Sequence, residues 1–417
     1  MSLGQLMKRI LMVQPAKVPI PRRGVDYRGK VVLAPMVRSG ELPSRILALD
    51  YGADLVWGPE TVDRAMIGTT RRCNDEFKTI DWCRPSGHNK ESTIYRMCPA
   101  REAGKHIFQI GTADPERAVQ AARLVAADVA GIDVNAGCPK PFSTSGGMGA
   151  ALLRTPDKLC AILEALVKYI TPEYEIGISV KIRILETAAE TEALVRRLCA
   201  TGITALTVHC RTTPMRPRER AIRGQLRMVA QVCHEFGVAC LMNGDVENKE
   251  QGFALAAEFG ADGAMIATAA EKNPTCFRRE ADGGLLPWRD VVSRYVEVAM
   301  DLNNHFSNTK YLLTQMIPGK EPHYRSATQV KTYGDICTAL QLHHLAEQAE
   351  EIDAKQGRTQ DSGKKALKRA RSNASALAAG GEMGQVRERA QSHKVLSERR
   401  VGDQSKEKQE SIALAVP

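Results

Sequence analysis

The sequence lacks long apolar runs and closely paired cysteines. No stretch of its 417 residues approaches the roughly 20 consecutive apolar residues of a membrane-spanning helix, so we expect no membrane association. None of the eleven cysteines forms a Cys-x-x-Cys pair, and most of them lie within apolar segments. This usage is typical of a reduced intracellular protein and argues against a disulfide framework or a zinc site, so we also expect no metal.

We expect no leader sequence either. There is no secretory signal, although no acidic residue precedes Asp26 and five basic residues do, which gives the amino terminus a weak likeness to a mitochondrial presequence. Pro15, Pro19 and Pro21 interrupt any amphipathic helix there, and serine is scarce. We therefore expect a cytoplasmic protein rather than a mitochondrial one.

Acidic residues are fewer than basic ones, and the excess of basic residues is concentrated at the carboxyl end. The formal net charge is +10, which favours a polyanionic partner. Residues 355–417 hold fourteen Lys and Arg against seven Asp and Glu, with few large apolar side chains and no aromatics. Such a segment cannot bury enough surface to fold, so we predict a disordered basic tail over residues 351–417. Residues 364–371 are rich in Lys and Arg, which fits a nuclear address, a nucleic-acid arm or a solubilising tail.

Short β-type runs alternate with helical segments between Lys30 and Lys272. Helix starts are visible between the runs, as at Asp114-Pro115-Glu116. The eight runs are 31–34, 54–57, 106–110, 131–135, 178–181, 205–209, 239–243 and 263–267. Their number and spacing predict a (β/α)8 TIM barrel, which typically takes about 250 residues. A doubly wound sheet is the alternative, but no Gly-x-Gly-x-x-Gly follows the first run.

The remaining segments complete the predicted organisation. We expect an amino-terminal extension over residues 1–29, the barrel over 30–286 and a small α-helical domain over 287–350. Helices are predicted from Trp288, around 309–313 and from 335 to 351. The helical domain carries several basic side chains, namely Lys310, Lys320, His323, Arg325 and Lys331.

Cys138 lies in the most informative segment of the chain. It follows the fourth run in the sequence Asp-Val-Asn-Ala-Gly-Cys-Pro-Lys over 133–140, where Gly137 and Pro139 prevent a strand or helix from continuing easily. A glycine-rich stretch at 145–149 lets the backbone approach a ligand closely before a helix begins near Pro156. A thiol with an ordinary pKa of about 8.5 stays protonated at neutral pH and can act as an acid. Most free cysteines are simply small buried residues, but these neighbours favour a functional one.

Other chemically useful side chains recur where the predicted strands end. In a closed parallel barrel the carboxyl ends of the strands converge on one face, where the active site is built. Any one of these residues alone is explained by the core, but their repetition predicts a site. They are Met36, Gln109, Asn135, Lys181, His209, Asn243 and Thr268.

Several motifs in a fixed order resemble those of the tRNA-dihydrouridine synthases over residues 30–345. Leu49-Asp50-Tyr51-Gly52-Ala53-Asp54 and Asn308-Thr309-Lys310-Tyr311 resemble the eukaryotic type-two group, which acts on the uridine at tRNA position 20. The motifs shared with the wider family are Ala34-Pro35-Met36, Asn135-Ala136-Gly137-Cys138-Pro139, Val180-Lys181-Ile182-Arg183, Val208-His209-Cys210-Arg211 and Asn243-Gly244-Asp245.

The resemblance implies an FMN-binding TIM barrel followed by a helical tRNA-binding domain. It implies that NADPH, or NADH, reduces FMN and that hydride then adds to C6 of a D-loop uridine. Cys138 would protonate C5, which completes reduction of the C5–C6 double bond. The implied partners are tRNA and NAD(P)H, and we expect a monomer.

Site residues carry over from the family position by position. Cys138 is the implied catalytic acid, and Lys181 would offset negative charge near N1 of the reduced flavin. The implied cofactor-binding residues are Pro35, Met36, Val37, Gln109, Lys181, His209, Asn243, Gly244, Asp245, Ala267 and Thr268. The implied substrate-binding residues are Asn135, Lys140, Arg183 and Arg211.

The main departure from the family pattern is at the position expected to bind the FMN phosphate. Ala267-Thr268 stands where the family usually has an arginine that binds the FMN phosphate, and losing such a contact removes about 1.5–3 kcal/mol. This departure leaves a non-catalytic tRNA-binding relative as one alternative. A flavoprotein that reduces a free pyrimidine is the other, although the basic surplus and the helical segment argue against it.

Overall fold

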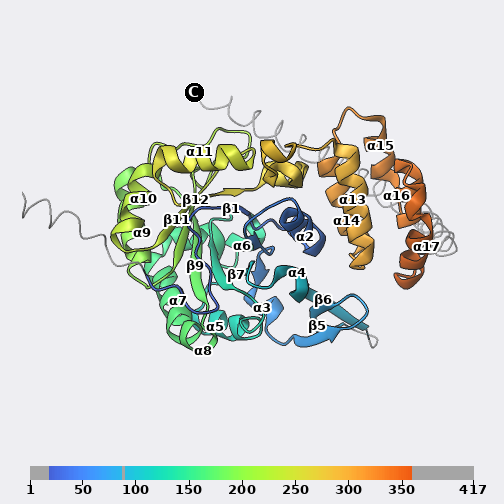
Figure 1. The fold of residues 1–417 in the computed structure, drawn as a ribbon. Helices are drawn as coiled ribbons and strands as arrows, with labels where there is room; N and C mark the ends of the chain where they lie inside the picture. Colours follow the sequence, from blue (N-terminus) through green and yellow to red (C-terminus); the bar gives the residue numbers. More distant parts are fainter. Residues whose placement is uncertain (1–17, 87–89, 359–417) are drawn as a thin grey trace, which may run out of the picture. The chain divides into compact units, whose positions relative to one another are not determined.

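Eight parallel strands close into a barrel in the computed structural model, which describes residues 18–86 and 90–358. Each strand pairs with the next in sequence, and β2 pairs with both β1 and β7, so the ring has no open edge. Figure 1 shows the ring with its helices outside. The strands are β1 (Lys30–Leu33), β2 (Val56–Trp57), β7 (His106–Gly111), β8 (Gly131–Ala136), β9 (Gly177–Arg183), β10 (Ala205–His209), β11 (Ala239–Asn243) and β12 (Gly263–Ile266). The predicted TIM barrel is confirmed, and the doubly wound sheet is excluded.

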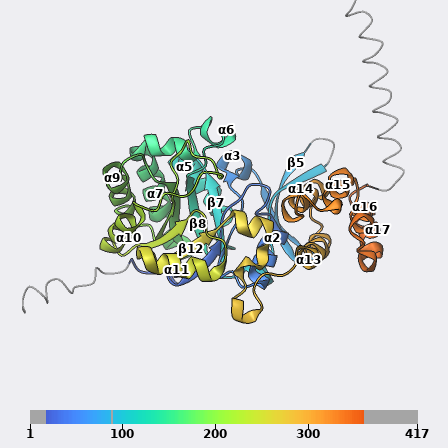
Figure 2. The same cartoon turned by 90° about the horizontal axis from the view of Figure 1, so that it is seen from above.

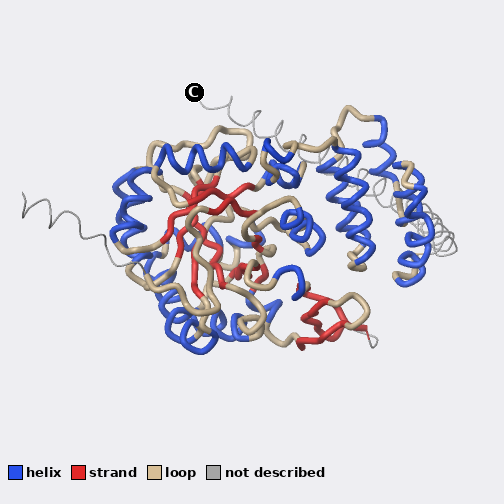
Figure 3. The backbone as a smooth tube through the Cα atoms, viewed as in Figure 1, coloured by secondary structure: helices blue, strands red, loops and turns tan. Residues whose placement is uncertain are grey.

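Helices surround the strands, as the blue and red tubes of Figure 3 show. The longer ones are α2 (Leu42–Asp50), α5 (Pro115–Arg123), α7 (Pro156–Tyr169), α9 (Ala188–Cys199), α10 (Leu226–Glu235) and α11 (Lys249–Phe259). Short helices lie between them, namely α3 (Asp63–Met66), α4 (Pro99–Glu102), α6 (Pro141–Thr144), α8 (Thr171–Tyr174) and α12 (Thr268–Lys272). The predicted cap at Asp114 is confirmed, because its side chain accepts the Arg117 N–H at 2.9 Å. No described helix is both long and apolar enough to cross a membrane.

The barrel strands are buried on both faces, so each contributes to two layers of core. Side chains alternate along a strand. Val32, Trp57 and Leu241 therefore pack inside the ring, while Val31, Val56 and Cys240 pack against the surrounding helices. This double burial explains why the sequence shows short apolar runs here instead of an alternating pattern.

A three-stranded antiparallel sheet lies between β2 and β7 in the sequence, and the sequence did not predict it. The sheet comprises β4 (Thr70–Asn74), β5 (Thr79–Ser86) and β6 (Lys90–Met97), and it follows β3 (Thr61–Val62), which pairs with β7. The residues of β4 are polar and mostly exposed. They give no apolar signal for a strand.

The carboxyl-terminal segment is helical, with α13 (Trp288–Asp301), α14 (Phe306–Met316), α15 (Pro322–Gln329), α16 (Tyr333–Leu340) and α17 (Ala346–Lys355). Figure 2 shows these helices from above. One compact unit extends to Val330 and takes in Ile336–Leu345, and a second contains Lys331–Asp335 and the chain from Ala346.

Two predictions for this segment need correction. A single helix over 335–351 is wrong, because Gln341 has a φ of 60° and a turn at His343–Leu345 separates α16 from α17. The predicted start of the tail at residue 351 falls inside α17. Residues 1–17 and 359–417 lie outside the described residues, as do most of the predicted tail and its basic cluster at 364–371.

Candidate active site

A cavity of about 370 Å³ opens where the barrel strands end. Its volume is within the usual range for small-molecule and cofactor sites. Every residue that the sequence predicted for the site lines this cavity. These are Pro35, Met36, Val37, Gln109, Asn135, Cys138, Lys140, Lys181, Arg183, His209, Arg211, Asn243, Gly244, Asp245, Ala267 and Thr268. The structure thus brings them together, and their individual roles stay predictions.

Cys138 is held on a turn whose main chain is bonded at four points. The Asn135 side chain accepts the N–H groups of Gly137 at 3.0 Å and Cys138 at 3.1 Å. The Cys138 carbonyl accepts the Ala150 N–H at 2.9 Å, and the Gly137 carbonyl accepts Nε of Arg183 at 2.9 Å. Asn135 was predicted to position a substrate base, but its side-chain oxygen is already engaged in shaping this turn.

The Cys138 thiol is placed to keep its proton. Burial raises the pKa of Cys138, and the neighbouring Glu60 carboxyl raises it further, whereas Lys140 and Lys181 act in the opposite direction. The net direction is upward from an ordinary value near 9, so the thiol is protonated at neutral pH. A raised thiol pKa suits a proton donor better than a nucleophile.

A buried carboxylate beneath the cavity orients one of the predicted cofactor ligands. Gln109, Asp133 and Ser179 are register partners on β7, β8 and β9. Asp133 is fully buried and accepts Nε2 of Gln109 at 2.8 Å and Oγ of Ser179 at 2.6 Å. This bond fixes the orientation of the Gln109 amide and uses one of its two N–H groups, so that its Oε1 is the atom that accepts a hydrogen bond in the cavity. Burial raises the pKa of Asp133 to about 6, so it is mostly charged at pH 7.

Lys181 places a tunable cation beside this carboxylate. Its register partner on β8 is Asn135, and its pKa falls to about 8, chiefly because of burial and then because of Arg183. Asp133 and Cys138 oppose that shift. Lys181 is thus charged at pH 7 and loses its charge as the pH rises through about 8.

His209 is a neutral imidazole on β10, the strand next to the one that carries Lys181. Burial, followed by the charge of Lys181, lowers its pKa to about 2. Its Nε2 lies 3.1 Å from Nη1 of Arg211, and arginine can only donate, so the ring proton must sit on Nδ1. His209 therefore offers an N–H donor without a charge.

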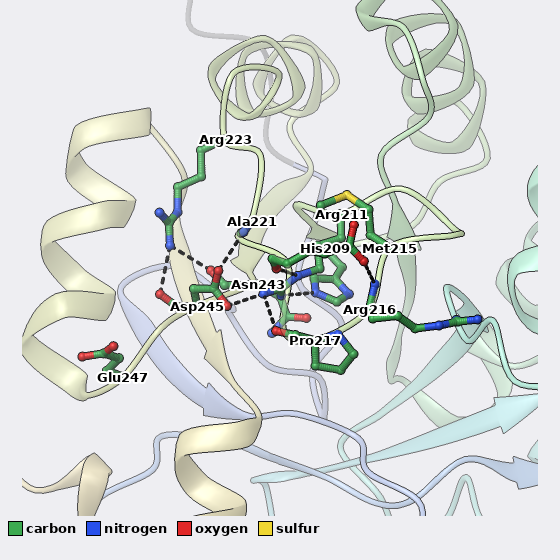
Figure 4. A network of polar contacts seen from close by, with 12 residues as sticks. His209, Arg211, Met215, Arg216, Pro217, Ala221, Arg223, Asn243, Asp245 and Glu247 are labelled. Atoms are coloured by element: carbon green, nitrogen blue, oxygen red, sulfur yellow. Dashed lines mark hydrogen bonds and ion pairs between the residues drawn. The ribbon is translucent and has the colours of Figure 1, made fainter.

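Arg183 and Arg211 were predicted to bind substrate, but most of their hydrogen-bonding groups are used within the protein. They are only 7% and 5% exposed. Arg183 donates to the carbonyl of Thr212 at 2.7 Å, and Arg211 donates to the carbonyl of Glu219 at 2.7 Å. Arg211 also pairs with Asp245, whose other oxygen accepts the Ala221 N–H at 2.7 Å (Figure 4). The geometry favours a role for both arginines, and for Asp245, in holding the loop above the cavity.

The lining also contains residues that the sequence prediction left out, among them Glu60 and Tyr311. Glu60 lies three residues beyond β2, so the rule that identified the other strand ends applied to it as well. It accepts the Ser143 hydroxyl at 2.9 Å, and burial raises its pKa. Tyr311 comes from α14, and the Arg38 guanidinium lies 5.4 Å from its ring centre. No strand-end rule could find Tyr311, although it belongs to a motif noted in the sequence.

The fold and the cavity define an enzyme of the (β/α)8-barrel class with a protonated thiol at its mouth. Comparison with known proteins identifies the family: the dihydrouridine synthase (Dus) family profile matches residues 32–372. The chain is 47% identical over 333 residues to tRNA-dihydrouridine(20) synthase [NAD(P)+] of Schizosaccharomyces pombe, covering 79% of this chain and 68% of that protein. It is 44% identical over 325 residues to the Saccharomyces cerevisiae protein of the same name, covering 76% and 84%. The chain therefore belongs to the dihydrouridine synthase family.

Proposed function

We propose that this protein is an FMN-dependent, NADPH-driven tRNA-dihydrouridine synthase that reduces the uridine at position 20 of the D-loop. The names of both yeast relatives specify tRNA, position 20 and NAD(P)+. The observation that carries the proposal is the protonated Cys138 thiol, which is braced in the same cavity as Gln109 and Lys181.

The residues around the cavity fit a flavin ring. The polar groups that line the cavity include the Gln109 carbonyl, the Lys181 ammonium and the neutral His209 imidazole. Small and apolar groups, including Pro35 and Ala267, also line it. A flat heterocycle with one polar edge matches that combination, because the Gln109 carbonyl suits an N–H group and the Lys181 ammonium suits an oxygen or an anionic nitrogen.

When bound, reduced FMN supplies a hydride that can add to C6 of uracil. Cys138 supplies the proton from Sγ to C5, and the thiol can hold it until negative charge develops there because the pKa is raised. The Lys181 ammonium and the Lys140 side chain line the same cavity and stabilise the thiolate that remains. The target base must leave its stack to reach this thiol, which costs a few kcal/mol.

FMN affinity must come from these contacts without the phosphate-binding arginine that is usual in the family. Thr268 stands at that position, as the first residue of α12. We propose that main-chain groups near Ala267 and the Thr268 hydroxyl bind the phosphate instead, with an affinity lower by about the 1.5–3 kcal/mol of a charged hydrogen bond.

One experiment separates this function from its alternatives. Purified protein is assayed with NADPH on unmodified tRNA, on the same tRNA with cytidine at position 20, and on free uridine. We expect a yellow protein that forms dihydrouridine only in the first substrate. Turnover of free uridine at a comparable rate would favour the pyrimidine reductase, and a colourless protein that binds tRNA without turnover would favour the non-catalytic relative.

The cellular setting follows from the same proposal. We propose a cytoplasmic, monomeric enzyme, with residues 364–371 as a candidate nuclear address that fluorescence imaging of the full chain and of a variant lacking this cluster tests. The same distribution between cytoplasm and nucleus in both proteins would show that the cluster has no targeting role.

A further inference from the structure

The loop between β10 and α10 concentrates positive charge at the edge of the cavity. Residues 211–223, here called the arginine loop, contain five arginines and one acidic residue, Glu219. Two kinds of arginine are present. Arg211 is buried beside His209, whereas Arg216, Arg218 and Arg220 are exposed.

The loop is held in place by groups beneath it. Arg183 reaches up from β9 to the carbonyls of Thr212 at 2.7 Å and Met215 at 3.4 Å. Arg211 bonds the carbonyl of Pro217 at 3.1 Å, as Figure 4 shows, and the carbonyl of Glu219 at 2.7 Å.

The far end of the loop is fastened to the turn after β11. Asp245 accepts the Ala221 N–H, and Arg223 donates to the carbonyls of Gly244 and Asp245, both at 2.9 Å. Buried arginines are costly to keep in a fold unless their bonds are well satisfied. Here Arg183 and Arg211 serve to fix the shape of a surface loop.

The exposed part of the arginine loop carries an excess of positive charge. No hydrogen bond or ion pair joins the side chains of Arg216, Arg218 or Arg220 to another residue in the described part of the chain. The one acid of the loop does not neutralise them, since Glu219 accepts the main-chain N–H of Arg216 at 2.6 Å. Arg216 also lies near enough to Arg183 to disfavour its charge. Such clustering of like charge favours an anion on the outer side of the loop.

The position of the loop narrows the kind of anion. Pro217 lines the cavity, and Arg216 and Arg218 are its neighbours in the sequence. A molecule that places one group in the cavity therefore carries its flanking groups past these arginines. A polynucleotide with one base in the cavity has phosphates on both sides of that base. A free pyrimidine has none.

We propose that the arginine loop is a preformed phosphate-binding surface that grips the tRNA backbone next to the base held in the cavity. This inference rests on the proposed function, and it adds the element that holds the substrate. Arg183 and Arg211 act as positioning residues for the loop, and Arg216, Arg218 and Arg220 contact phosphates.

The test is the salt dependence of tRNA binding by the full-length protein in which Arg216, Arg218 and Arg220 are all changed to Gln. Each phosphate contact contributes a slope of about 0.7–0.9 to the plot of log affinity against log salt concentration. In the triple variant we expect the magnitude of that slope to fall by about 2–3 and the KM for tRNA to rise. NADPH oxidation and bound flavin should match the wild type, because these side chains are outside the cavity.

Two matched variants serve as controls. Lys30→Gln, Lys105→Gln and Lys168→Gln together remove three positive charges near the amino ends of the barrel strands, and this variant should keep the wild-type slope. The second variant combines Arg216→Lys, Arg218→Lys and Arg220→Lys. It keeps the three positive charges and should restore most of the wild-type slope. A Tm like that of the wild type will show that each variant is folded.

An unchanged slope in the Gln variant, or an equal loss in the control at the opposite end, would overturn the proposal. A raised KM for NADPH with an unchanged KM for tRNA would also overturn it, because the loop would then bind the dinucleotide. These outcomes are distinct from a failure of the proposed function, in which the wild-type protein itself forms no dihydrouridine in tRNA.

Discussion

At the scale of single residues, the central requirement is an acid that keeps its proton until the reaction needs it. Cys138 meets this requirement through its surroundings, because partial burial and the Glu60 carboxyl both disfavour the thiolate. Its position is equally constrained, since Asn135 and Ala150 bond the main chain on either side of the thiol. These surroundings support the proposal that Cys138 is the proton donor.

The role of Glu60 gives a first prediction. Because its negative charge raises the pKa of Cys138, Glu60→Gln should lower that pKa, and the thiol should lose its proton at a lower pH. The alkaline limb of single-turnover uridine reduction should move in the same direction. Thiolate absorbance, taken as the difference from the matching protein with Cys138→Ser, measures the pKa directly. A thiol pKa that is unchanged or higher in Glu60→Gln would contradict this role.

Asp133 gives a second prediction. Asp133→Asn removes the charge that opposes the fall in the pKa of Lys181, so that lysine should lose its proton below pH 8 instead of near it. It also leaves a single acceptor oxygen for the two donors Gln109 and Ser179, which should weaken FMN binding about tenfold, a typical hydrogen-bond contribution. Fluorescence titration of FMN across pH measures both effects. Ser179→Ala, which leaves the Gln109 bond intact, is the control.

Much of the site could be predicted at this scale, because strand ends in a closed barrel converge. What the sequence could not reveal is how the polar groups divide their bonds. Arg183 and Arg211 look like substrate ligands in a motif, yet their partners include carbonyls of residues up to 46 positions away. Pairings of that kind depend on loop conformation, for which no local pattern exists.

At the scale of elements, the inserted sheet is tied to the barrel by a buried ion pair. Arg45 of α2 bonds Glu102 of α4 at 2.6 Å, and it also donates to the carbonyl of Arg96 on β6 at 2.7 Å. Both charged side chains are fully buried. Nearby, the hydroxyl of Tyr95 meets Nε2 of His106 at 2.6 Å, which links β6 to barrel strand β7.

Removing one member of this pair should therefore destabilise the fold severely. Glu102→Ala leaves the Arg45 charge buried without its partner, and we expect a loss of about 3–5 kcal/mol in the free energy of unfolding. Denaturant titration measures this loss. The double variant Arg45→Met with Glu102→Leu should recover much of it, and a single variant as stable as the wild type would show that the pair is dispensable.

The elements themselves divide into predictable and unpredictable ones by burial. The eight barrel strands and helices such as α5 and α7 follow from apolar runs, caps and prolines. The sheet of β4 to β6 did not, because its exposed strand is rich in charge and polar groups. The break between α16 and α17 was missed because a non-glycine residue, Gln341, adopts the left-handed conformation there.

At the scale of the whole molecule, charge and architecture point to the same substrate. The barrel provides an enclosed site for one ring, while the exposed arginines of the loop above it remain without partners in the described part of the chain. The basic tail, predicted from composition, lies outside the described residues. Its contribution to tRNA binding and the domain boundaries at 30 and 287 stay predictions.

The most direct test of the account is the product formed by Cys138→Ala. We expect this variant to bind flavin and tRNA, and to oxidise NADPH in its reductive half-reaction, as the wild type does. Mass spectrometry of tRNA digests should then find no dihydrouridine at position 20. Wild-type amounts of dihydrouridine from this variant would contradict the assignment of the Cys138 thiol as the proton donor.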